Sequence, residues 1–343
     1  MSAAITDPFT HHGAHLGLAR SLWPDAPKPW IDLSTAINPS PYPAPHPSVQ
    51  ARARLPDPQE LQNLEAAAAR AFGVDDPDRI LATAGSETVV RFLPHVLPAV
   101  TAACIVWPTY SSHTDIWQSL GVPVGRVSGI ERASLAEGTV VTLVNPNSPD
   151  GTMTPREQLL AAHDRIADLD GFLVIDEAFA DADASCSVAS LAGTERYPRM
   201  IVLRSFGKFY GLAGVRLGFM IGAPALVKRI RTALGDWPVA ADAITAGLAA
   251  YNDPLWAERT RIRLRSATRK LDALLIRSGF DIVGGTPLFR LAHSDLAQAR
   301  FNQLLRAGIL VRPFTHDTKL LRFGLPHGDA AWRRLRETLR ARP

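Results

Sequence analysis

Six short apolar runs alternate with helix-like segments between residues 80 and 250 of the chain. The runs are Ile80–Thr83, Ala103–Trp107, Val140–Val144, Phe172–Ile175, Met200–Leu203 and Gly218–Ile221. Continuous apolar runs of this kind are typical of strands that are buried on both faces. Because helix-like segments separate them, the pattern predicts an α/β fold, with helices on both sides of a mostly parallel sheet.

The pattern changes after Pro254, where a long, Arg-rich amphipathic helix is expected to begin. Beyond it, strand-like and helix-like segments alternate with short turns, and these are Asp281–Val283, Leu288–Leu291, Asp295–Ala307, Ile309–Arg312 and Leu320–Gly324. Such an alternation predicts a smaller α+β domain. Upstream, the Ala-, Leu- and Glu-rich segment Pro58–Phe72 has helical composition and ends at Gly73.

The chain is long enough for two domains, since it has 343 residues and single cores tend to split beyond about 250–300 residues. The segment Pro39–Pro47 holds five prolines and is expected to be an extended linker. We therefore predict three parts. Residues 1–45 form an N-terminal arm that contributes to the small domain, residues 46–253 form the large domain, and residues 254–343 form the small C-terminal domain.

Charge and cysteine content argue against several classes of protein. The net charge is +4, but the excess arginines lie in Glu258–Arg277 and Trp332–Arg342, which lack the interleaved aromatic residues of a nucleic-acid platform. Cys104 and Cys186 are the only cysteines and have no spacing typical of a zinc site, so a reducing compartment is expected. The pattern shows neither an export signal nor a membrane span. We expect a cytoplasmic protein that binds no nucleic acid, membrane or metal.

A lysine follows the fifth apolar run in an unusual setting. Ligands of parallel α/β sheets bind at the carboxyl ends of the strands, and Lys208 lies there within Ser205–Gly211 (SFGKFYG). Most lysines lie on the surface, but aromatic residues and glycines flank this one. An apolar setting lowers the pKa of a lysine and makes its neutral amine available for Schiff-base chemistry. Ser205 and Arg216 are close enough in sequence to reach a phosphate.

Asp176 and Ala178 follow the fourth run. A lone Asp at a strand end is often a helix cap or a Mg²⁺ ligand. Beside a Schiff-base lysine, a carboxylate has another use, because it keeps a pyridine nitrogen protonated and so makes the ring an electron sink. Ala178 is small enough to lie beneath such a ring.

Three further strand ends carry polar or aromatic residues that suit the same ligand. The turn with Gly85, Ser86 and Glu87 opens a helix, whose N-terminus is either an anion site or an ordinary cap. Tyr110 is placed either in the core or to stack on a cofactor ring. Asn147, beside Ser148 in an Asn/Pro/Gly turn, offers an amide to a phenolic oxygen, unless the turn is only a turn.

In this order, the residues resemble the fold-type I enzymes that depend on pyridoxal 5′-phosphate (PLP), the aspartate aminotransferase superfamily, over essentially the whole chain. The specific part is Ser205–Gly218 (SFGKFYGLAGVRLG). The resemblance implies that the large domain binds PLP as a Schiff base on Lys208, that Asp176 pairs with the pyridinium nitrogen and that Tyr110 stacks on the ring. It also implies that the residues around the cofactor phosphate are Gly85, Ser86, Ser205 and Arg216.

The opening residues resemble a narrower family. The segments His12–Leu16 (HGAHL) and Trp30–Pro39 (WIDLSTAINP) are similar to those of the L-threonine-O-3-phosphate decarboxylases of cobalamin biosynthesis, which are in turn similar to histidinol-phosphate aminotransferases. The resemblance implies decarboxylation of a small phosphorylated amino acid by a homodimer. An aminotransferase of the histidinol-phosphate type and a non-catalytic PLP-binding regulator stay open as alternatives.

Four residues are candidates for holding the substrate. Arg322 stands where the family has its carboxylate-binding arginine, with Asn38 beside it in this role. Arg312 and His12 are candidates for the substrate phosphate, since a planar guanidinium suits that group. These residues decide which bond at Cα stands perpendicular to the cofactor ring, and therefore whether carbon dioxide or a proton leaves.

Three positions depart from the family pattern. Ser148 stands where an Asn is usual, so a shorter hydroxyl replaces the amide expected on the ring oxygen, and Asn147 is the candidate to compensate. Phe179 replaces a Tyr found in many aminotransferases. Leu55 stands where related enzymes carry a Tyr that reaches the cofactor phosphate of the partner subunit, so Leu55 is not predicted to be a ligand.

Overall fold

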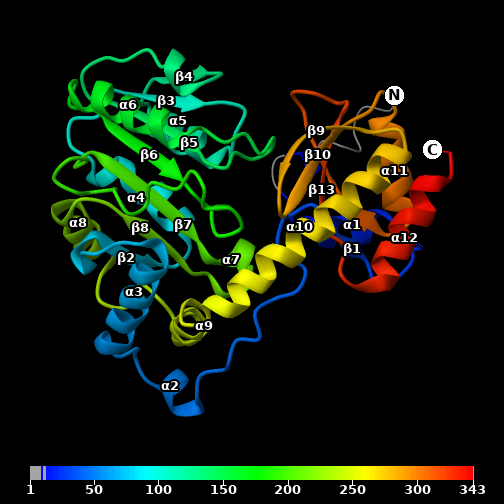
Figure 1. Ribbon diagram of the computed structural model, residues 1–343, viewed down its shortest axis with the longest axis horizontal. Helices are drawn as coiled ribbons and strands as arrows, with labels where there is room; N and C mark the ends of the chain where they lie inside the picture. The colour runs from blue at the N-terminus through cyan, green and yellow to red at the C-terminus, as the bar shows by residue number, and fades with distance from the viewer. Residues whose placement is uncertain (1–8, 11–12, 343) are drawn as a thin grey trace. The chain divides into compact units, whose positions relative to one another are not determined.

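The computed structural model describes residues 9–10 and 13–342, and these fall into two compact units (Figure 1). The larger unit comprises Tyr42–Ser148 and Thr152–Glu258. The smaller unit comprises the described residues before Tyr42, the tripeptide Pro149–Gly151 and the described residues from Arg259 onward. Helix α10 (Pro254–Arg277) begins in the larger unit and ends in the smaller one.

A seven-stranded sheet in the order β2-β8-β7-β6-β5-β3-β4 forms the centre of the larger unit. Its strands are β2 (Ile80–Thr83), β3 (Ala102–Val106), β4 (Val124–Val127), β5 (Thr139–Val144), β6 (Phe172–Asp176), β7 (Met200–Ser205) and β8 (Gly218–Ile221). Strands β7, β6, β5, β3 and β4 run parallel, whereas β8 is antiparallel to both β7 and β2. The predicted α/β fold with a mostly parallel sheet is confirmed.

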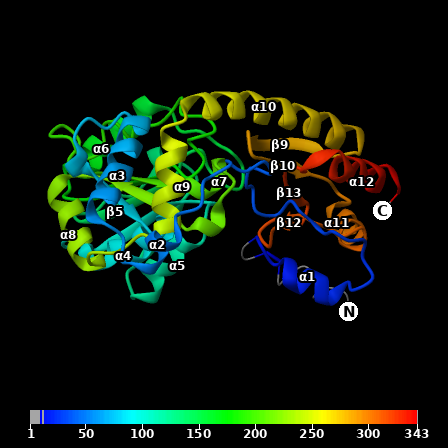
Figure 2. The same ribbon diagram turned by 90° about the horizontal axis from the view of Figure 1, so that it is seen from below.

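Helices cover both faces of this sheet. The helices of the larger unit are α2 (Val49–Ala53), α3 (Pro58–Phe72), α4 (Ser86–Val96), α5 (Ser112–Ser119), α6 (Arg156–Ala167), α7 (Phe206–Phe209), α8 (Pro224–Leu234) and α9 (Ala241–Tyr251), with the 3₁₀ turns η2 (Pro77–Arg79), η3 (Ile130–Arg132) and η4 (Ala213–Val215). On one face, apolar residues of α4, α5 and α8 pack against Val174, Ile201 and Leu203. On the other face, Phe72 and Tyr251 contact Phe219, and their helices α3 and α9 lie side by side (Figure 2).

Local signals explain why α3 has the limits that its composition predicts. The side chain of Asp57 caps the first turn by accepting a hydrogen bond from the Gln59 N–H, and Pro58 occupies the first position, where no N–H is needed. At the other end, Gly73 adopts the left-handed conformation, with φ at 71°. A residue with a Cβ is disfavoured in that conformation, so the glycine ends the helix.

The smaller unit contains a four-stranded antiparallel sheet in the order β12-β13-β10-β9 and a parallel pair, β1-β11. Its elements are α1 (Leu16–Leu22), β1 (Ile31–Asp32), β9 (Asp281–Thr286), β10 (Phe289–His293), α11 (Ala297–Arg306), β11 (Ile309–Leu310), β12 (Arg312–Pro313), β13 (Leu320–Gly324) and α12 (Gly328–Arg340). The structure splits the single strand expected at Ile309–Arg312, because β11 pairs with β1 whereas β12 pairs with β13. Among the described residues, no helix is both long and apolar enough to cross a membrane.

Candidate active site

The strand ends of β6 and β7 bring Asp176 and Lys208 to the same edge of the large sheet. Asp176 is the last residue of β6, and Lys208 lies in the short helix α7 that directly follows β7. The Lys208 Nζ atom lies 5.2 Å from the centroid of the Phe179 ring. The flanking residues Phe206 and Phe209 are buried while Lys208 is only half-buried. The lysine therefore has the aromatic setting that the sequence predicts.

Asp176 is buried and held in one orientation by two hydrogen bonds. Its Oδ2 atom lies 3.0 Å from Nε2 of His113, and its Oδ1 accepts from the Ala178 N–H at 3.0 Å. Burial acts to raise the pKa of Asp176, but His113, the charge of Lys208 and the Ala178 amide together hold this pKa below its ordinary value. The carboxylate is therefore ionised at neutral pH and able to stabilise a protonated ring nitrogen.

His113 is a site residue that the sequence reasoning missed. It lies in α5, three residues beyond Tyr110, and its ring meets the Tyr110 ring edge to face at 5.9 Å. It reaches Asp176 across 63 residues of sequence. The available signal was weak, since a single His on a short helix is usually a core or surface residue.

Tyr110 contacts His113 on one side and Glu87 of the first turn of α4 on the other. Burial raises the pKa of the Tyr110 hydroxyl, a hydrogen bond with Ser112 opposes this effect, and a hydrogen bond with Glu87 adds to the rise. Glu87 in turn accepts a hydrogen bond from Arg91 Nε at 2.7 Å. The tyrosine is thus a protonated, oriented ring whose hydroxyl is already engaged, which suits a stacking role more than proton transfer.

The N-terminus of α4 and Arg216 form a cradle for an anion. Gly85 has φ at 87°, and a Cβ built on it would lie 2.6 Å from Arg216 Nη2. A Cβ on Gly218 would lie 2.2 Å from the backbone N of Ser86. Gly85 therefore leaves room for the Arg216 guanidinium beside the helix N-terminus, and Gly218 lets strand β8 lie against the backbone at the start of that helix. Amide groups and a guanidinium together favour a phosphate.

The turn after β5 is tied to the loop after β3. Asn147 Oδ1 accepts from the Thr109 hydroxyl at 2.8 Å, and its Nδ2 donates to the Pro108 carbonyl at 2.9 Å. Ser148, next in sequence, is buried. The amide of Asn147 thus supports the loop that carries Tyr110, and its compensation for Ser148 on a ring oxygen stays a prediction.

Two arginines of the smaller unit face each other across neighbouring strands. Arg312 of β12 and Arg322 of β13 are register partners. Arg322 is buried and donates from Nη2 to the Ser34 carbonyl at 2.5 Å. Burial and the charge of Arg312 lower the pKa of Arg322, and Asp32 offsets this only in part. Two like charges on register partners favour the binding of an anion.

The remaining substrate candidates are Asn38 and His12. Asn38 is buried, and its Oδ1 accepts from the Ser40 N–H at 3.0 Å. His12 lies outside the described residues. The structure therefore brings the lysine, carboxylate, aromatic and cradle residues together in the larger unit, and it places Asn38, Arg312 and Arg322 in the smaller unit.

Known protein families and relatives match this chain over most of its length. Residues 37–338 match the family model of class I and II aminotransferases. A threonine-phosphate decarboxylase of Pseudomonas aeruginosa is 36% identical over 325 residues, which are 94% of this chain and 95% of the relative. A threonine-phosphate decarboxylase of a Sinorhizobium species is 36% identical over 342 residues, 99% and 98% of the two chains. A histidinol-phosphate aminotransferase of Symbiobacterium thermophilum is 31% identical over 253 residues, 71% and 68%.

Solved structures share the fold at lower identity. A histidinol-phosphate aminotransferase of Sinorhizobium meliloti, in complex with PLP, superposes with a TM-score of 0.80 at 18% identity and covers 99% of this chain and 98% of its own. An L-threonine-O-3-phosphate decarboxylase of Porphyromonas gingivalis has a TM-score of 0.74 at 20% identity, with 90% and 98% covered. At such identities the likeness supports the fold alone.

Proposed function

The chain belongs to the class I and II aminotransferase family and is a PLP-dependent enzyme; from this premise we propose that it decarboxylates L-threonine O-3-phosphate to (R)-1-amino-2-propanol O-2-phosphate. One observation carries the choice of substrate. Arg312 and Arg322 are register partners, and a substrate with both a phosphate and a carboxylate supplies an anion for each guanidinium. The name shared by the two relatives that are 36% identical supports the same choice.

The larger unit has the groups that this cofactor needs. Asp176 would face the ring nitrogen, Lys208 would hold the aldehyde carbon, and the cradle of Gly85 and Arg216 would hold the phosphate, with Ser86 and Ser205 beside it. The buried, ionised state of Asp176 and the close approach at Gly85 both fit such a ligand. When bound, PLP supplies an electron sink for the electron pair left at Cα when a bond there breaks.

The substrate is held by its two anionic ends. Arg322 binds the carboxylate with Asn38 beside it, and Arg312 binds the phosphate, to which His12 also contributes. Holding both ends fixes the rotation about the bonds at Cα, so the bond to the carboxylate, and not the C–H bond, is the one that is weakened. Lys208 Nζ then donates a proton to Cα, where it takes the place of the carboxylate that has left as carbon dioxide. His113 keeps Asp176 ionised and oriented throughout.

A product assay tests this proposal. The purified protein is incubated with PLP and L-threonine O-3-phosphate in the absence of any keto acid. A decarboxylase releases carbon dioxide over many turnovers and accumulates the amino alcohol phosphate. Failure to release carbon dioxide, together with turnover of histidinol phosphate only when a keto acid is added, would support the second candidate, which the relative that is 31% identical favours.

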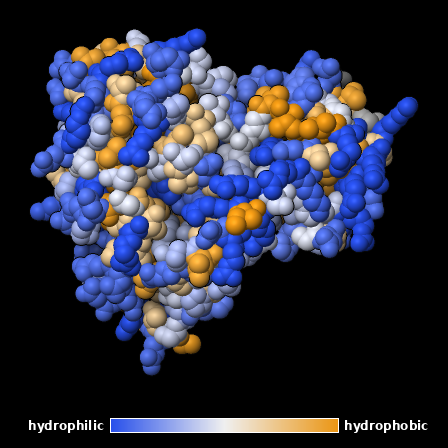
Figure 3. All heavy atoms as spheres, in the orientation of Figure 1, coloured by the Kyte–Doolittle hydropathy of each residue, from blue (hydrophilic) through white to orange (hydrophobic). Residues whose placement is uncertain are grey.

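We also propose that the enzyme is a homodimer that serves cobalamin biosynthesis. Hydrophobic side chains reach the surface of the larger unit, among them Val49 at 83%, Leu55 at 62% and Trp237 at 53% exposed, and Figure 3 shows hydrophobic groups among hydrophilic ones on one face. Burial of such side chains in a subunit interface removes them from water. Sedimentation at several concentrations tests the dimer, and growth of a deletion strain with and without added cobalamin tests the pathway.

A further inference from the structure

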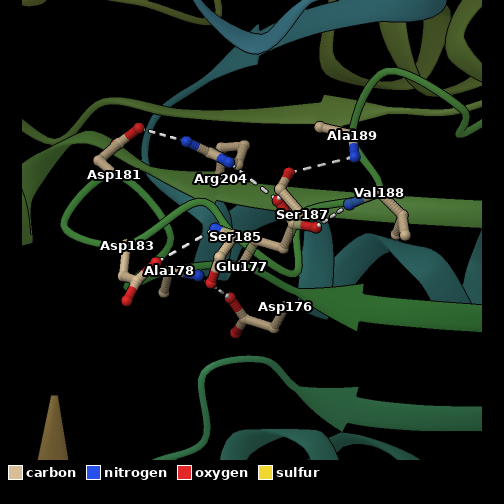
Figure 4. Close-up of polar contacts among 10 residues, drawn as sticks. All are labelled: Asp176, Glu177, Ala178, Asp181, Asp183, Ser185, Ser187, Val188, Ala189 and Arg204. Carbon is tan, nitrogen blue, oxygen red and sulfur yellow. Dashed lines mark hydrogen bonds and ion pairs between the residues drawn. The ribbon is translucent and has the colours of Figure 1, made fainter. Parts of the chain in front are cut away.

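The strand ends of β6 and β7 carry a second polar cluster, which the proposed reaction does not use. In a parallel pair, register partners share a face and successive residues alternate between faces. Asp176 is the register partner of Leu203, which belongs to the core beneath α4 and α5. Glu177 and Arg204, one residue further along, therefore point to the opposite face. There Arg204 Nη1 donates to Glu177 Oε2 at 2.8 Å (Figure 4).

Hydrogen bonds of Arg204 and Glu177 hold the loop that follows β6. The second amino group of Arg204, Nη2, donates to Asp181 Oδ1. Glu177 Oε2 also accepts from the Ser187 hydroxyl at 2.6 Å, and its Oε1 accepts from the Val188 N–H at 2.8 Å. Figure 4 shows Asp181, Ser187 and the Val188 backbone amide beside Arg204 and Glu177. One guanidinium and one carboxylate thus fix the start, the middle and the end of residues 177–188.

The cluster is buried and rich in negative charge. The side chains of Arg204, Glu177 and Asp181 are 4%, 0% and 8% exposed, and two carboxylates share the one guanidinium. The guanidinium also lies over the Phe72 ring, 4.4 Å from its centroid. Burial acts to lower the pKa of Arg204, but the charges of Asp181 and Glu177 outweigh it and raise this pKa. Arg204 is therefore always charged, and its planar fork sets where both carboxylates lie.

We propose that Arg204 is the positioning residue that keeps Asp176 and Lys208 in their relative places. The proposal rests on the proposed function, because it presumes that both residues bind PLP. Glu177 is covalently next to Asp176, and Arg204 stands four residues before Lys208. A displacement of the Arg204–Glu177 ion pair would therefore change the position of the Asp176 carboxylate relative to Lys208. A lysine at position 204 would keep the charge but would lose the fork that contacts two carboxylates at once.

The test compares Arg204→Lys with Asp183→Asn, a control in the same loop that is half-buried and whose carboxylate accepts a local, exposed hydrogen bond from the Ser185 N–H at 3.1 Å. Affinity for PLP is measured by fluorescence titration, and the pH midpoint of the visible absorbance is measured for the holoenzyme. We expect Arg204→Lys to weaken PLP binding about tenfold, as the loss of outer partners does in metal sites, and to shift the midpoint. Asp183→Asn should change neither.

These measurements distinguish failure of the proposed function from failure of the positioning role of Arg204. Wild-type protein that binds no PLP would refute the proposed function before any variant is compared. A folded Arg204→Lys variant with the affinity and pH midpoint of the wild type would overturn the positioning role alone, because a residue that only stabilises the fold does not move a spectroscopic midpoint. Thermal unfolding of each apo protein shows whether the variant is folded.

A second pair of variants covers the case in which Arg204→Lys does not fold. In an Asp181→Asn background, a lysine at 204 has a single carboxylate partner, so charge is balanced. We expect this double variant to bind PLP about tenfold more weakly than Asp181→Asn alone, with a shifted midpoint. Equal affinities and midpoints would overturn the proposal. So would a double variant that fails to fold while Asp181→Asn folds, because Arg204 would then serve the fold itself.

Discussion

Two sites, one in each unit, arrange charge in opposite ways. In the larger unit, buried charges meet partners that offset them: Asp176 lies 3.0 Å from His113, and Arg204 contacts Glu177 and Asp181. In the smaller unit, Arg312 and Arg322 are register partners of like charge. In the first arrangement each charge lies beside an opposite one, whereas in the second a bound anion would add to what the Ser34 carbonyl and Asp32 already supply to Arg322.

The difference between the two arrangements predicts which substitutions lower stability and which lower ligand binding. Breaking a buried pair leaves an uncompensated charge and destabilises the fold. Removing Arg322 also removes its hydrogen bond to the Ser34 carbonyl, but the relief of repulsion offsets that loss, so the protein should tolerate the change while ligand binding is lost. Substitution of the paired buried charges in the larger unit should therefore lower both stability and activity. Substitution of Arg312 or Arg322 should lower mainly activity.

The largest effect is expected from Asp176→Asn. The neutral amide cannot hold a protonated ring nitrogen, so kcat should fall about a thousandfold, the upper end of the loss for one preorganised electrostatic partner. Steady-state kinetics with saturating PLP measures it, and Asp183→Asn serves as the control. A kcat within a few-fold of the wild type would show that this carboxylate does not support the reacting group.

The sharpest contrast between the units comes from Arg322→Met. The KM for L-threonine O-3-phosphate should rise about a hundredfold, in line with the loss of a hydrogen bond to a charged group. The free energy of unfolding should change by less than about 1 kcal/mol, because relief of the repulsion with Arg312 offsets the loss of the hydrogen bond to the Ser34 carbonyl.

The matched control is Arg290→Met in the same sheet. Arg290 bonds through Nε and Nη2 to Asp272, at 2.5 and 3.1 Å. Its removal should lower the free energy of unfolding by about 1 kcal/mol and leave KM unchanged. If Arg322→Met destabilised the protein as much as Arg290→Met, the difference between like and opposite charge pairs would be refuted. Urea unfolding of both variants provides the comparison.

The effect of His113→Asn depends on pH. In the wild type the pKa of Asp176 lies below its ordinary value of 3.8. Ionised Asp176 therefore contributes stability above that pH, and this contribution is lost as pH falls through the lowered value. Without His113, burial dominates and raises this pKa. The variant should lose about 1.5–3 kcal/mol of unfolding free energy at neutral pH, and the loss should shrink toward pH 4. A loss that is constant with pH would contradict this role.

The sequence predicts most of the fold because apolar runs mark buried strands directly. Strands β2, β8 and β13 have the limits that their hydrophobic runs indicate. Strand β4 (VGRV) was missed, because it lies at the sheet edge and its middle residues are exposed, so it carries no continuous apolar run. The split at Val311 between two sheets was also missed, since pairing partners far away in sequence decide it.

The candidate site shows the same limit. Lys208, Asp176 and Gly85 follow strands of one sheet, so the sequence order alone indicates that they share an edge. His113 and the Arg204 cluster depend on contacts across elements, and neither follows from local spacing. An arginine at the end of one apolar run and a glutamate just after its neighbour was a usable signal for the Arg204–Glu177 pair, because parallel neighbours place such residues side by side.

Attachment of PLP to the lysine after β7 is the most direct test. Purified protein is incubated with PLP, reduced with borohydride and digested, and the modified peptide is identified by mass spectrometry. We expect the label on Lys208 and none on Lys228 of helix α8. A label on another lysine, or no label at all, would contradict the central claim.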